Sequence, residues 1–179
     1  MRLQRFNLLV GCPRERERAA RSETQYFIGD LLDDPSLIIA ATPGSGLLTC
    51  LTTLDPFQVV YRLREFADEN PYQFRFAVRF TPMEKCVPST VEEIVSAVVE
   101  LRDKIEDGES FRVTVRRRRS ELDTMHVVRS VAETISRKVN LERPDRTIWI
   151  EIVGELSGIS ILVTERDILS IRAMEDGMH

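Results

Sequence analysis

Residues 111–119 organise the sequence, and they read Phe111-Arg-Val-Thr-Val-Arg-Arg-Arg-Arg119. Apolar residues alternate with polar ones over the first positions, the apolar set being Phe111, Val113 and Val115. This period of two is typical of a strand with one buried and one solvent-facing side. The arginines repel one another unless an anion lies over them, and their planar forks match phosphate oxygens. The stretch therefore predicts a strand that carries its charge outward, and nucleic acid is its expected partner.

The charge distribution supports a localised basic surface. The 179 residues carry a formal net charge of -4, which argues against a chain that coats nucleic acid along its whole surface. Between positions 111 and 146, ten Lys or Arg residues oppose five Asp or Glu residues, so this segment carries +5 and the rest carries -9. With 42% hydrophobic residues, the chain can bury one good core or two small ones.

The sequence predicts a cytoplasmic protein without a membrane span. Its longest apolar runs, Leu37–Ala41 and Gly158–Val163, are far shorter than the roughly 20 residues that a membrane helix needs. The apolar segment Phe6–Val10 is too short for a signal-peptide core.

The cysteines and histidines do not predict a metal site. Cys12, Cys50 and Cys86 are widely spaced, without the paired short spacings of zinc ligands, and are interpreted as buried thiols. His126 and the terminal His179 are the only histidines. We expect no metal and no cofactor.

The first half predicts a small α+β layer. A strand is expected over Arg5–Cys12 and a helix from Pro13 to Leu32, in which alternating Arg and Glu favour a solvated, salt-bridged face over an RNA contact. Further elements are expected in the order strand, strand, helix, strand, over Leu37–Ala41, Leu47–Thr53, Pro56–Ala67 and Tyr72–Val87. Pro82 is expected to interrupt or end the last of these strands. The loop Thr42–Gly46 has a superficial likeness to a phosphate cradle but is interpreted as a hairpin turn, because it lacks the Lys-Ser/Thr ending of a P-loop.

The second half predicts another α+β unit. Ser89 with Glu92, or Thr90 with Glu93, is a capping box before a strongly periodic helix that ends near Gly108. After the arginine strand, a helix capped at Ser120 is expected, with an apolar stripe that reaches Val139. Strands follow over Thr147–Val153, Ile159–Val163 and Ile168–Ile171, the last completing the same sheet. Trp149 is expected to pack under a helix rather than to stack on a base.

Several of these pieces together resemble the THUMP domain, an RNA-binding module of tRNA-modifying proteins. The resemblance covers about Pro82 to Ala173 and rests on the order and spacing of five pieces, namely Phe111–Arg119, a helix, Lys138–Leu141 leading to Pro144-Asp145, Ile148–Val153 and Gly158–Ile161. The preceding half resembles the N-terminal region that accompanies THUMP, joined through Arg79–Pro82. The expected fold is α+β, with an N-terminal subdomain (1–81), a THUMP-like domain whose helices pack on a mixed sheet (82–173) and a frayed C-terminus (174–179).

In length and layout the chain is most similar to the free-standing THUMP proteins of the Tan type, which assist an RNA cytidine acetyltransferase. This resemblance implies that the protein holds tRNA by its acceptor stem and 3′ CCA end while the partner forms N4-acetylcytidine. The sequence contains no Gly-rich methyl-donor loop, Ser-Gly-Gly pyrophosphatase loop or deaminase zinc motif. The protein is therefore expected not to be an enzyme.

The expected RNA contacts are the cations of the basic strand and of the segments after it, namely Arg112, Arg116, Arg117, Arg118, Arg119, Arg137, Lys138 and Arg143. Arg116 and Arg118 are favoured because they fall on the outer face of the strand, whereas Arg137, Lys138 and Arg143 could be solvated ends of a helix and loop. Two alternatives stay open: a general RNA-binding protein, and an adaptor whose arginines meet an acidic protein surface. Catalysis by His126 with Asp123 or a cysteine is disfavoured, because no nucleophile has a recognisable base partner.

Overall fold

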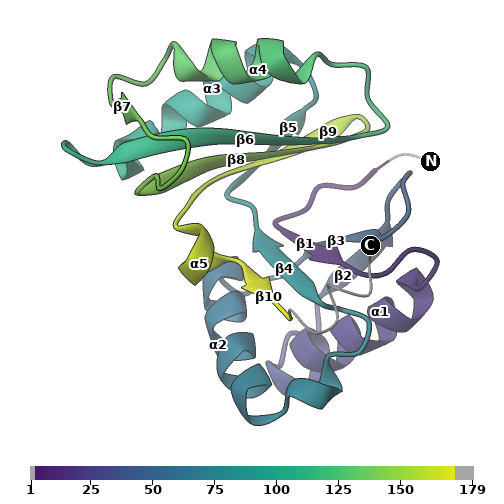
Figure 1. Cartoon of the computed structure of the whole chain (residues 1–179). Coiled ribbons are helices and arrows are strands. Elements are labelled where there is room, and N and C mark those ends of the chain that lie inside the picture. The colour runs from purple at the N-terminus through teal and green to yellow at the C-terminus, as the bar shows by residue number, and fades with distance from the viewer. Residues whose placement is uncertain (1–2, 172–179) are drawn as a thin grey trace. The chain divides into compact units, whose positions relative to one another are not determined.

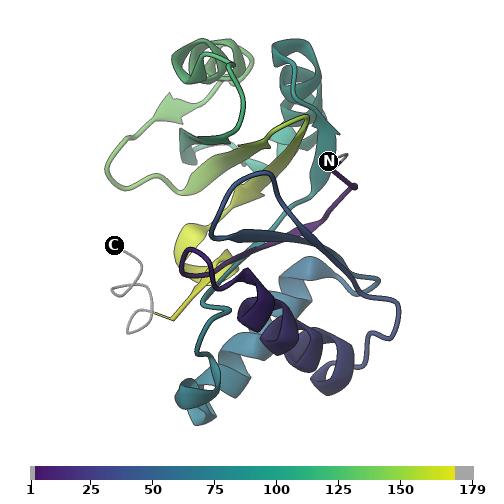
Figure 2. The ribbon, with the colours of Figure 1, turned by 90° about the vertical axis from the view of Figure 1, so that its right-hand side faces the viewer.

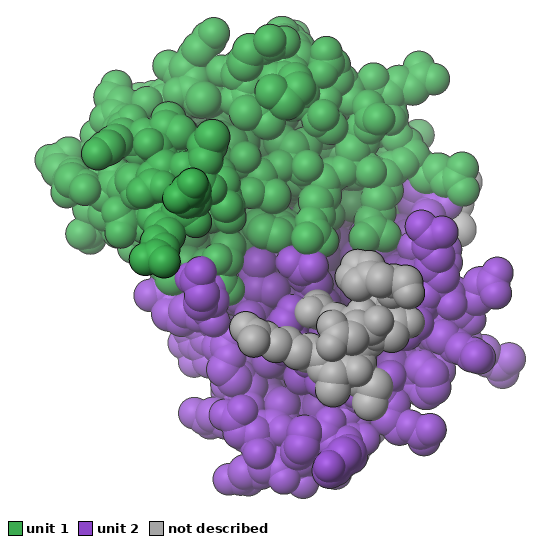
Figure 3. Space-filling view, viewed as in Figure 1, with its two compact units in different colours: residues 1–3, 84–164 green, residues 4–83, 165–179 purple. Residues whose placement is uncertain are grey.

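The computed structural model describes residues 3–171, and within them the chain forms two five-stranded sheets with helices packed against them (Figure 1). The expected α+β class is confirmed. The chain divides into two compact units: Gln4–Met83 joins the segment from Glu165 onward, and Glu84–Thr164 forms most of the other (Figure 3). The segment 174–179, for which the sequence predicts fraying, lies outside the described residues. None of the helices within 3–171 has the length and apolar character needed to cross a membrane.

The first sheet is antiparallel throughout and has the strand order β10-β4-β1-β3-β2. Its strands are β1 (Leu8–Gly11), β2 (Ile38–Ala41), β3 (Leu47–Leu51), β4 (Arg79–Pro82) and β10 (Leu169–Ser170). Helix α1 (Glu17–Thr24), a π-helical continuation, η1 (Gln25–Leu31), and α2 (Pro56–Glu69) lie on one side of this sheet (Figure 2). Alternate strand residues face these helices and bury a core in which the rings of Phe27 and Phe74 stack at 4.1 Å.

Local signals placed several elements of this unit correctly. The expected hairpin is β2–β3, joined by the turn at Thr42–Gly46, where Gly46 has a φ of +83°. Asp55 caps α2 by accepting the N–H of Phe57, and Pro56 opens the helix.

The second sheet is mixed, with the order β5-β9-β8-β6-β7. Its strands are β5 (Lys85–Pro88), β6 (Ser110–Arg118), β7 (Lys138–Val139), β8 (Arg146–Val153) and β9 (Leu156–Leu162). β6 runs parallel to β7 and β8, and the other pairs are antiparallel. Helices α3 (Val91–Leu101) and α4 (Thr124–Ala132) cover one face of the sheet (Figure 1). Of the two capping boxes that the sequence allowed, the structure uses Thr90, whose hydroxyl accepts the N–H of Glu93.

The long strand expected over Tyr72–Val87 is wrong in its first part, whereas the interruption expected at Pro82 is confirmed, because β4 ends there. The structure instead has a short 3-10 helix at Pro71–Gln73, an irregular segment, and then β4 and β5, which belong to different sheets. One carboxylate oxygen of Glu23 accepts the backbone N–H groups of the three residues 75–77, at 3.1, 2.8 and 2.9 Å. These amides therefore have a side-chain partner in place of a neighbouring strand.

The last strand also differs from the expectation. β10 pairs with β4 in the first sheet, so the chain returns to its first unit after the second sheet is complete. The short helix α5 (Thr164–Asp167) leads into β10. Two side chains of α2 bond to this segment. Tyr61 donates its hydroxyl to the buried Asp167 at 2.6 Å, and Arg64 donates to the carbonyls of Arg166 and Ile168.

Two further expectations about helices are wrong. The helix after the arginine strand is capped by Asp123 rather than by Ser120, and it ends at Ala132, so Val139 belongs to β7. The arginines of α1 and the preceding turn are exposed, which confirms the expected solvated face, but the expected salt bridges are wrong. None of Arg14, Arg16, Arg18 and Arg21 pairs with an acid of the described chain.

Candidate nucleic-acid interface

Strand β6 has the two faces that its sequence predicts. Phe111, Val113 and Val115 pack into the core beneath α3 and α4. The arginines at alternate positions, Arg112 and Arg116, therefore point to the sheet face that carries no helix, and both are half-buried.

The eight expected RNA-contacting residues fall into two groups at opposite ends of β6. The N-terminal group comprises Arg112, Arg137, Lys138 and Arg143, since β7 pairs Lys138 with Ser110 at the start of β6. The C-terminal group comprises Arg116–Arg119, where the chain leaves β6 for α4. At a rise of about 3.3 Å per residue, Arg112 and Arg118 are roughly 20 Å apart. Figure 1 shows β7 beside one end of the strand and the loop to α4 leaving the other end.

The exposed members of the C-terminal group are Arg117 and Arg119. Arg117 donates from Nη1 to the carbonyl of Leu122 at 2.7 Å, which fixes its side chain over the loop. Arg119 has a φ of +54°, so the chain turns there and the strand does not continue. Arg118 is half-buried, and its carbonyl accepts the N–H of Gly154 at 2.8 Å. The alternation of the sequence favours Arg116 and Arg118 as the outermost residues, but in the structure their neighbours Arg117 and Arg119 are the more exposed.

Arg116 lies over the only tryptophan of the sequence. Its guanidinium carbon is 4.9 Å from the centroid of the Trp149 ring, and the indole N–H donates to the Glu151 carboxylate at 3.0 Å. Trp149 is buried, with 5% of its surface exposed, but it is on the sheet face opposite the helices. The expectation that it packs under a helix is therefore wrong. The indole instead supports Arg116 through a cation-π contact.

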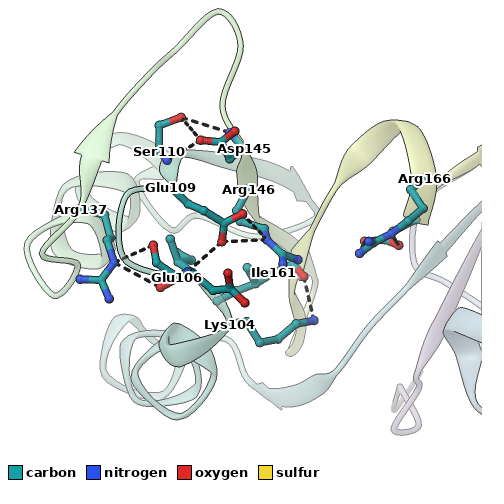
Figure 4. A network of polar contacts seen from close by, with 11 residues as sticks. Lys104, Glu106, Glu109, Ser110, Arg137, Asp145, Arg146, Ile161 and Arg166 are labelled. Carbon is teal, nitrogen blue, oxygen red and sulfur yellow. Dashed lines mark hydrogen bonds and ion pairs between the residues drawn. The ribbon is translucent and has the colours of Figure 1, made fainter.

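Arg137 in the N-terminal group binds the protein's own backbone. Its Nε donates to the carbonyls of Ile105 and Glu106 (Figure 4). Its Nη1 donates to the carbonyl of Ser136, and its Nη2 is 2.9 Å from the carboxylate of Asp107. These contacts hold the connection between α4 and β7 against the loop before β6. Arg137 therefore has a structural role in addition to any contact with a ligand.

Arg112 is also engaged, because its Nη1 donates to the carbonyl of Leu141 at 2.9 Å. Its Nε is buried without an acceptor among the described residues. Lys138 and Arg143 are exposed. The backbone N–H of Arg143 donates to the side-chain oxygen of Asn140, so the loop that presents Arg143 is ordered by its own turn.

A carboxylate fixes the far end of this loop. Asp145 accepts both the N–H and the hydroxyl of Ser110, at 2.8 and 3.1 Å (Figure 4). These bonds, the backbone one first, hold the pKa of Asp145 below its usual value. The loop 140–146 is thus pinned to the start of β6.

The structure accounts for two of the residues considered for catalysis, Asp123 and Cys50, without a catalytic role. The carboxylate of Asp123 accepts the backbone N–H groups of Met125 and His126 as the N-cap of α4. Burial raises the pKa of the Cys50 thiol to about 12, which removes it as a nucleophile near neutral pH.

Sequence reasoning did not single out Met125. This side chain is in the first turn of α4, just beyond residues 119–123, the arginine loop that follows β6, and 57% of its surface is exposed. Its position outside the apolar stripe of the helix was the available signal.

Comparison with known proteins identifies the second unit. Residues 88–162 match the family model of the THUMP domain, which confirms that part of the resemblance. None of the curated protein sequences compared with this chain matches it.

Three solved structures share the fold over most of this chain. The first is PH1313 from Pyrococcus horikoshii Ot3, with a TM-score of 0.65 and 19% identity, covering 91% of this chain and 54% of that chain. The second is TrmN from Thermus thermophilus, with a TM-score of 0.58 and 17% identity, covering 92% of this chain and 46% of that chain. The third is a 4-thiouridine synthetase in complex with RNA and bound ATP, with a TM-score of 0.58 and 13% identity, covering 93% of this chain and 42% of that chain. The chain therefore spans about half the length of these proteins. At such identities the similarity establishes the fold.

Proposed function

We propose that this chain is a non-catalytic tRNA-binding protein that presents the acceptor stem and 3′ CCA end of tRNA to a modifying enzyme. The observation that carries the proposal is the C-terminal group, in which Arg117 and Arg119 are exposed at one edge of a THUMP domain. A 4-thiouridine synthetase of the same fold forms a complex with RNA, which supports RNA as the ligand.

The geometry of the C-terminal group suits a duplex backbone. A-form RNA is recognised mainly by its shape and by contacts to phosphates and 2′-hydroxyls, so cations at fixed positions suffice without a base code. Arg116 is held over Trp149 and Arg117 is tied to Leu122, so less side-chain freedom is lost when phosphates bind.

The unpaired 3′ end gives the ligand a second feature to recognise. Single-stranded nucleotides expose base faces that pack on apolar side chains. Met125 is exposed beside the arginine loop and offers such a surface next to the phosphate-binding cations. A short acceptor end, rather than an extended RNA, also fits a chain whose remainder is acidic.

We infer that the modifying enzyme is a separate RNA cytidine acetyltransferase that forms N4-acetylcytidine. The resemblance to the Tan-type proteins supports this partner. The roles found for Asp123 and Cys50 support a non-catalytic chain, because the carboxylate caps a helix and the thiol is buried.

Gel-shift titrations with three RNAs test the binding mode. Intact tRNA and an acceptor-stem minihelix with its CCA end should bind alike, and a tRNA without CCA should bind about ten-fold more weakly. Removal of one charge-assisted or terminal interaction of about 1.5 to 3 kcal/mol accounts for a change of this size. Equal affinity with and without CCA would withdraw the presenting role in favour of general RNA binding.

A nucleoside analysis tests the partner and the absence of catalysis. The purified chain, incubated with tRNA and acetyl-coenzyme A or S-adenosylmethionine, should leave the nucleoside profile unchanged. Cells that lack the protein should lose N4-acetylcytidine from tRNA. A new nucleoside formed by the pure chain would overturn the non-catalytic assignment, and retained N4-acetylcytidine would overturn the partner.

A further inference from the structure

The edge strand β2 of the first sheet lies beside an open groove of about 610 Å³. Three of the lining residues belong to α1 and η1 and three to β2 or the residue before it, namely Arg21, Ser22, Gln25, Leu37, Ile38 and Ile39. A second groove of about 450 Å³ runs along α1 and the turn before it, shares Ser22 with the first and adds Glu15, Arg16, Arg18 and Ala19. Three arginines and one acid therefore line the two grooves. The first groove thus lies between α1 and the edge strand β2, and the second borders the same helix. The two grooves together are called the trough.

The edge itself lacks the usual protection. β2 is bonded to β3 on one side only, so alternate N–H and C=O groups point away from the sheet. Edge strands commonly carry a charge, a proline or a bulge that prevents further pairing. β2 reads Ile-Ile-Ala-Ala without any of these, and 47% of the Ile38 surface is exposed. Such an edge can accept an added strand.

The helix that borders the trough carries uncompensated positive charge. Arg18 and Arg21 are exposed, and neither forms an ion pair with an acid of residues 3–171. Two acids of the same helix, Glu17 and Glu23, accept hydrogen bonds from other parts of the unit and do not pair with these arginines. Glu17 accepts the Ser45 hydroxyl at 2.8 Å and the Gly46 N–H at 2.7 Å, and Glu23 accepts the three amides of residues 75–77.

The bond from Gly46 also holds the pKa of Glu17 below its usual value, although burial acts in the opposite direction. This carboxylate therefore stays ionised while it serves the turn before β3. The arginines are left facing solvent along the trough.

We propose that β2 and α1 form a docking site for an extended segment of a partner protein, in which acidic and apolar residues alternate. The segment adds a strand to the edge of the sheet and pairs its backbone with β2. Ile39 belongs to the core beneath the helices, so Ile38 is on the opposite face. Side chains of the added strand on the helix face then meet Arg18 and Arg21, and those on the other face meet Ile38.

Two other occupants fit less well. A second copy paired through β2 would bring the α1 helices of both copies together across the two-fold axis, where their unpaired arginines repel. An RNA backbone would use the arginines but would leave the strand edge and Ile38 without partners. The inference does not depend on RNA binding by the THUMP domain.

Fluorescence anisotropy with a defined probe tests the proposal. A fluorescein-labelled peptide of alternating Glu and Val should bind the full chain with a dissociation constant below about 1 mM. A peptide of alternating Lys and Val should bind at least ten-fold more weakly. The same loss is expected for a Glu-Val peptide that is N-methylated at every second residue, on the amides that would donate to β2. Amide exchange in β2 should slow when the peptide binds. Failure of the Glu-Val peptide to bind, or equal binding of all the peptides, would overturn the proposal.

Variants localise the binding. Arg18→Glu with Arg21→Glu should weaken peptide binding at least ten-fold and leave tRNA affinity within about two-fold. Arg62→Glu on α2, an exposed arginine outside the trough, is the matched control and should change neither. If the double variant loses tRNA binding instead, this face is an RNA surface. If it changes the oligomeric state measured by light scattering, the occupant is a second copy. Either result overturns the peptide assignment, and circular dichroism checks that each variant folds.

Discussion

The two ends of strand β6 carry the same residue type with different uses. At the C-terminal end, Arg117 and Arg119 are exposed, and Arg116 is held over an indole. At the N-terminal end, Arg112 and Arg137 donate to four carbonyls of the protein itself. Loops that bring carbonyls together need donors, and guanidinium groups supply several at once. At the C-terminal end Arg117 also donates one N–H, to the carbonyl of Leu122, but its side chain stays exposed. An arginine cluster in a sequence therefore predicts an anion-binding surface best at the end where fewer of the donors are bonded to the protein's own backbone.

Charge reversal at the C-terminal end should have the largest effect. Arg117→Glu with Arg119→Glu is expected to weaken tRNA binding by about 100-fold or more, since each charge-assisted hydrogen bond to phosphate is worth about 1.5 to 3 kcal/mol. The slope of log affinity against log salt should fall by about 0.9 for each duplex phosphate that the variant no longer neutralises. Lys138→Glu with Arg143→Glu, at the other end of β6, is the matched comparison and should cost less. An equal loss of tRNA affinity in the two double variants would show that both ends of β6 contribute alike to binding.

Truncation of Arg137 should lower the stability of the fold more than its affinity for tRNA. Arg137→Ala removes the donors to three carbonyls and the ion pair with Asp107, so the free energy of unfolding should fall by about 1 to 3 kcal/mol. The tRNA affinity of the folded variant should change little. Arg119→Ala should weaken tRNA binding and leave the free energy of unfolding nearly unchanged. Urea unfolding measures the stability of both variants, and gel shifts measure their tRNA affinity. A stable Arg137→Ala protein with poor tRNA binding would contradict the structural role.

The contact between Arg116 and Trp149 should have a smaller effect. Arg116→Gln removes the cation over the ring and should lower the free energy of unfolding by about 0.5 to 1 kcal/mol. Trp149 is the only tryptophan, so its fluorescence emission reports the change directly. Arg129→Gln, at an exposed position on α4, should leave the emission unchanged. An identical spectrum for both variants would mean that the cation-π contact does not form in solution.

Acid stability should show the smallest effect, at the loop pinned by Asp145. The Ser110 bonds hold the folded-state pKa of Asp145 below the usual 3.8, so the carboxylate stabilises the fold above that value. This contribution is lost as the pH falls through the lower folded-state pKa. Asp145→Asn should therefore flatten the dependence of the melting temperature on pH below about 4, while Glu142→Gln, at an exposed position, should not. Parallel curves for Asp145→Asn and the unaltered protein would show that the bonds to Ser110 do not form in solution.

Local patterns in the sequence determined much of the fold. The alternation in β6 and β8 sets which residues face the helices, because a strand places successive side chains on opposite sides. The caps at Asp55 and Thr90 set where two helices begin, since each satisfies amides within three residues. The position of the basic segment was also evident from residue counts alone.

Only the tertiary structure decided which partners these residues meet. The alternation before Thr81 resembles a strand, yet the amides of residues 75–77 bond to Glu23, more than 50 positions earlier. The strand β10 pairs with β4 rather than with its neighbours in sequence, and the exposure of Arg117 and Arg119 depends on the turn at Arg119. Periodicity reports which side of an element is buried, but a hydrogen-bond acceptor far along the chain leaves no periodic signal. Which arginines hold the protein together and which face a ligand was therefore set by contacts that only the folded chain brings within reach.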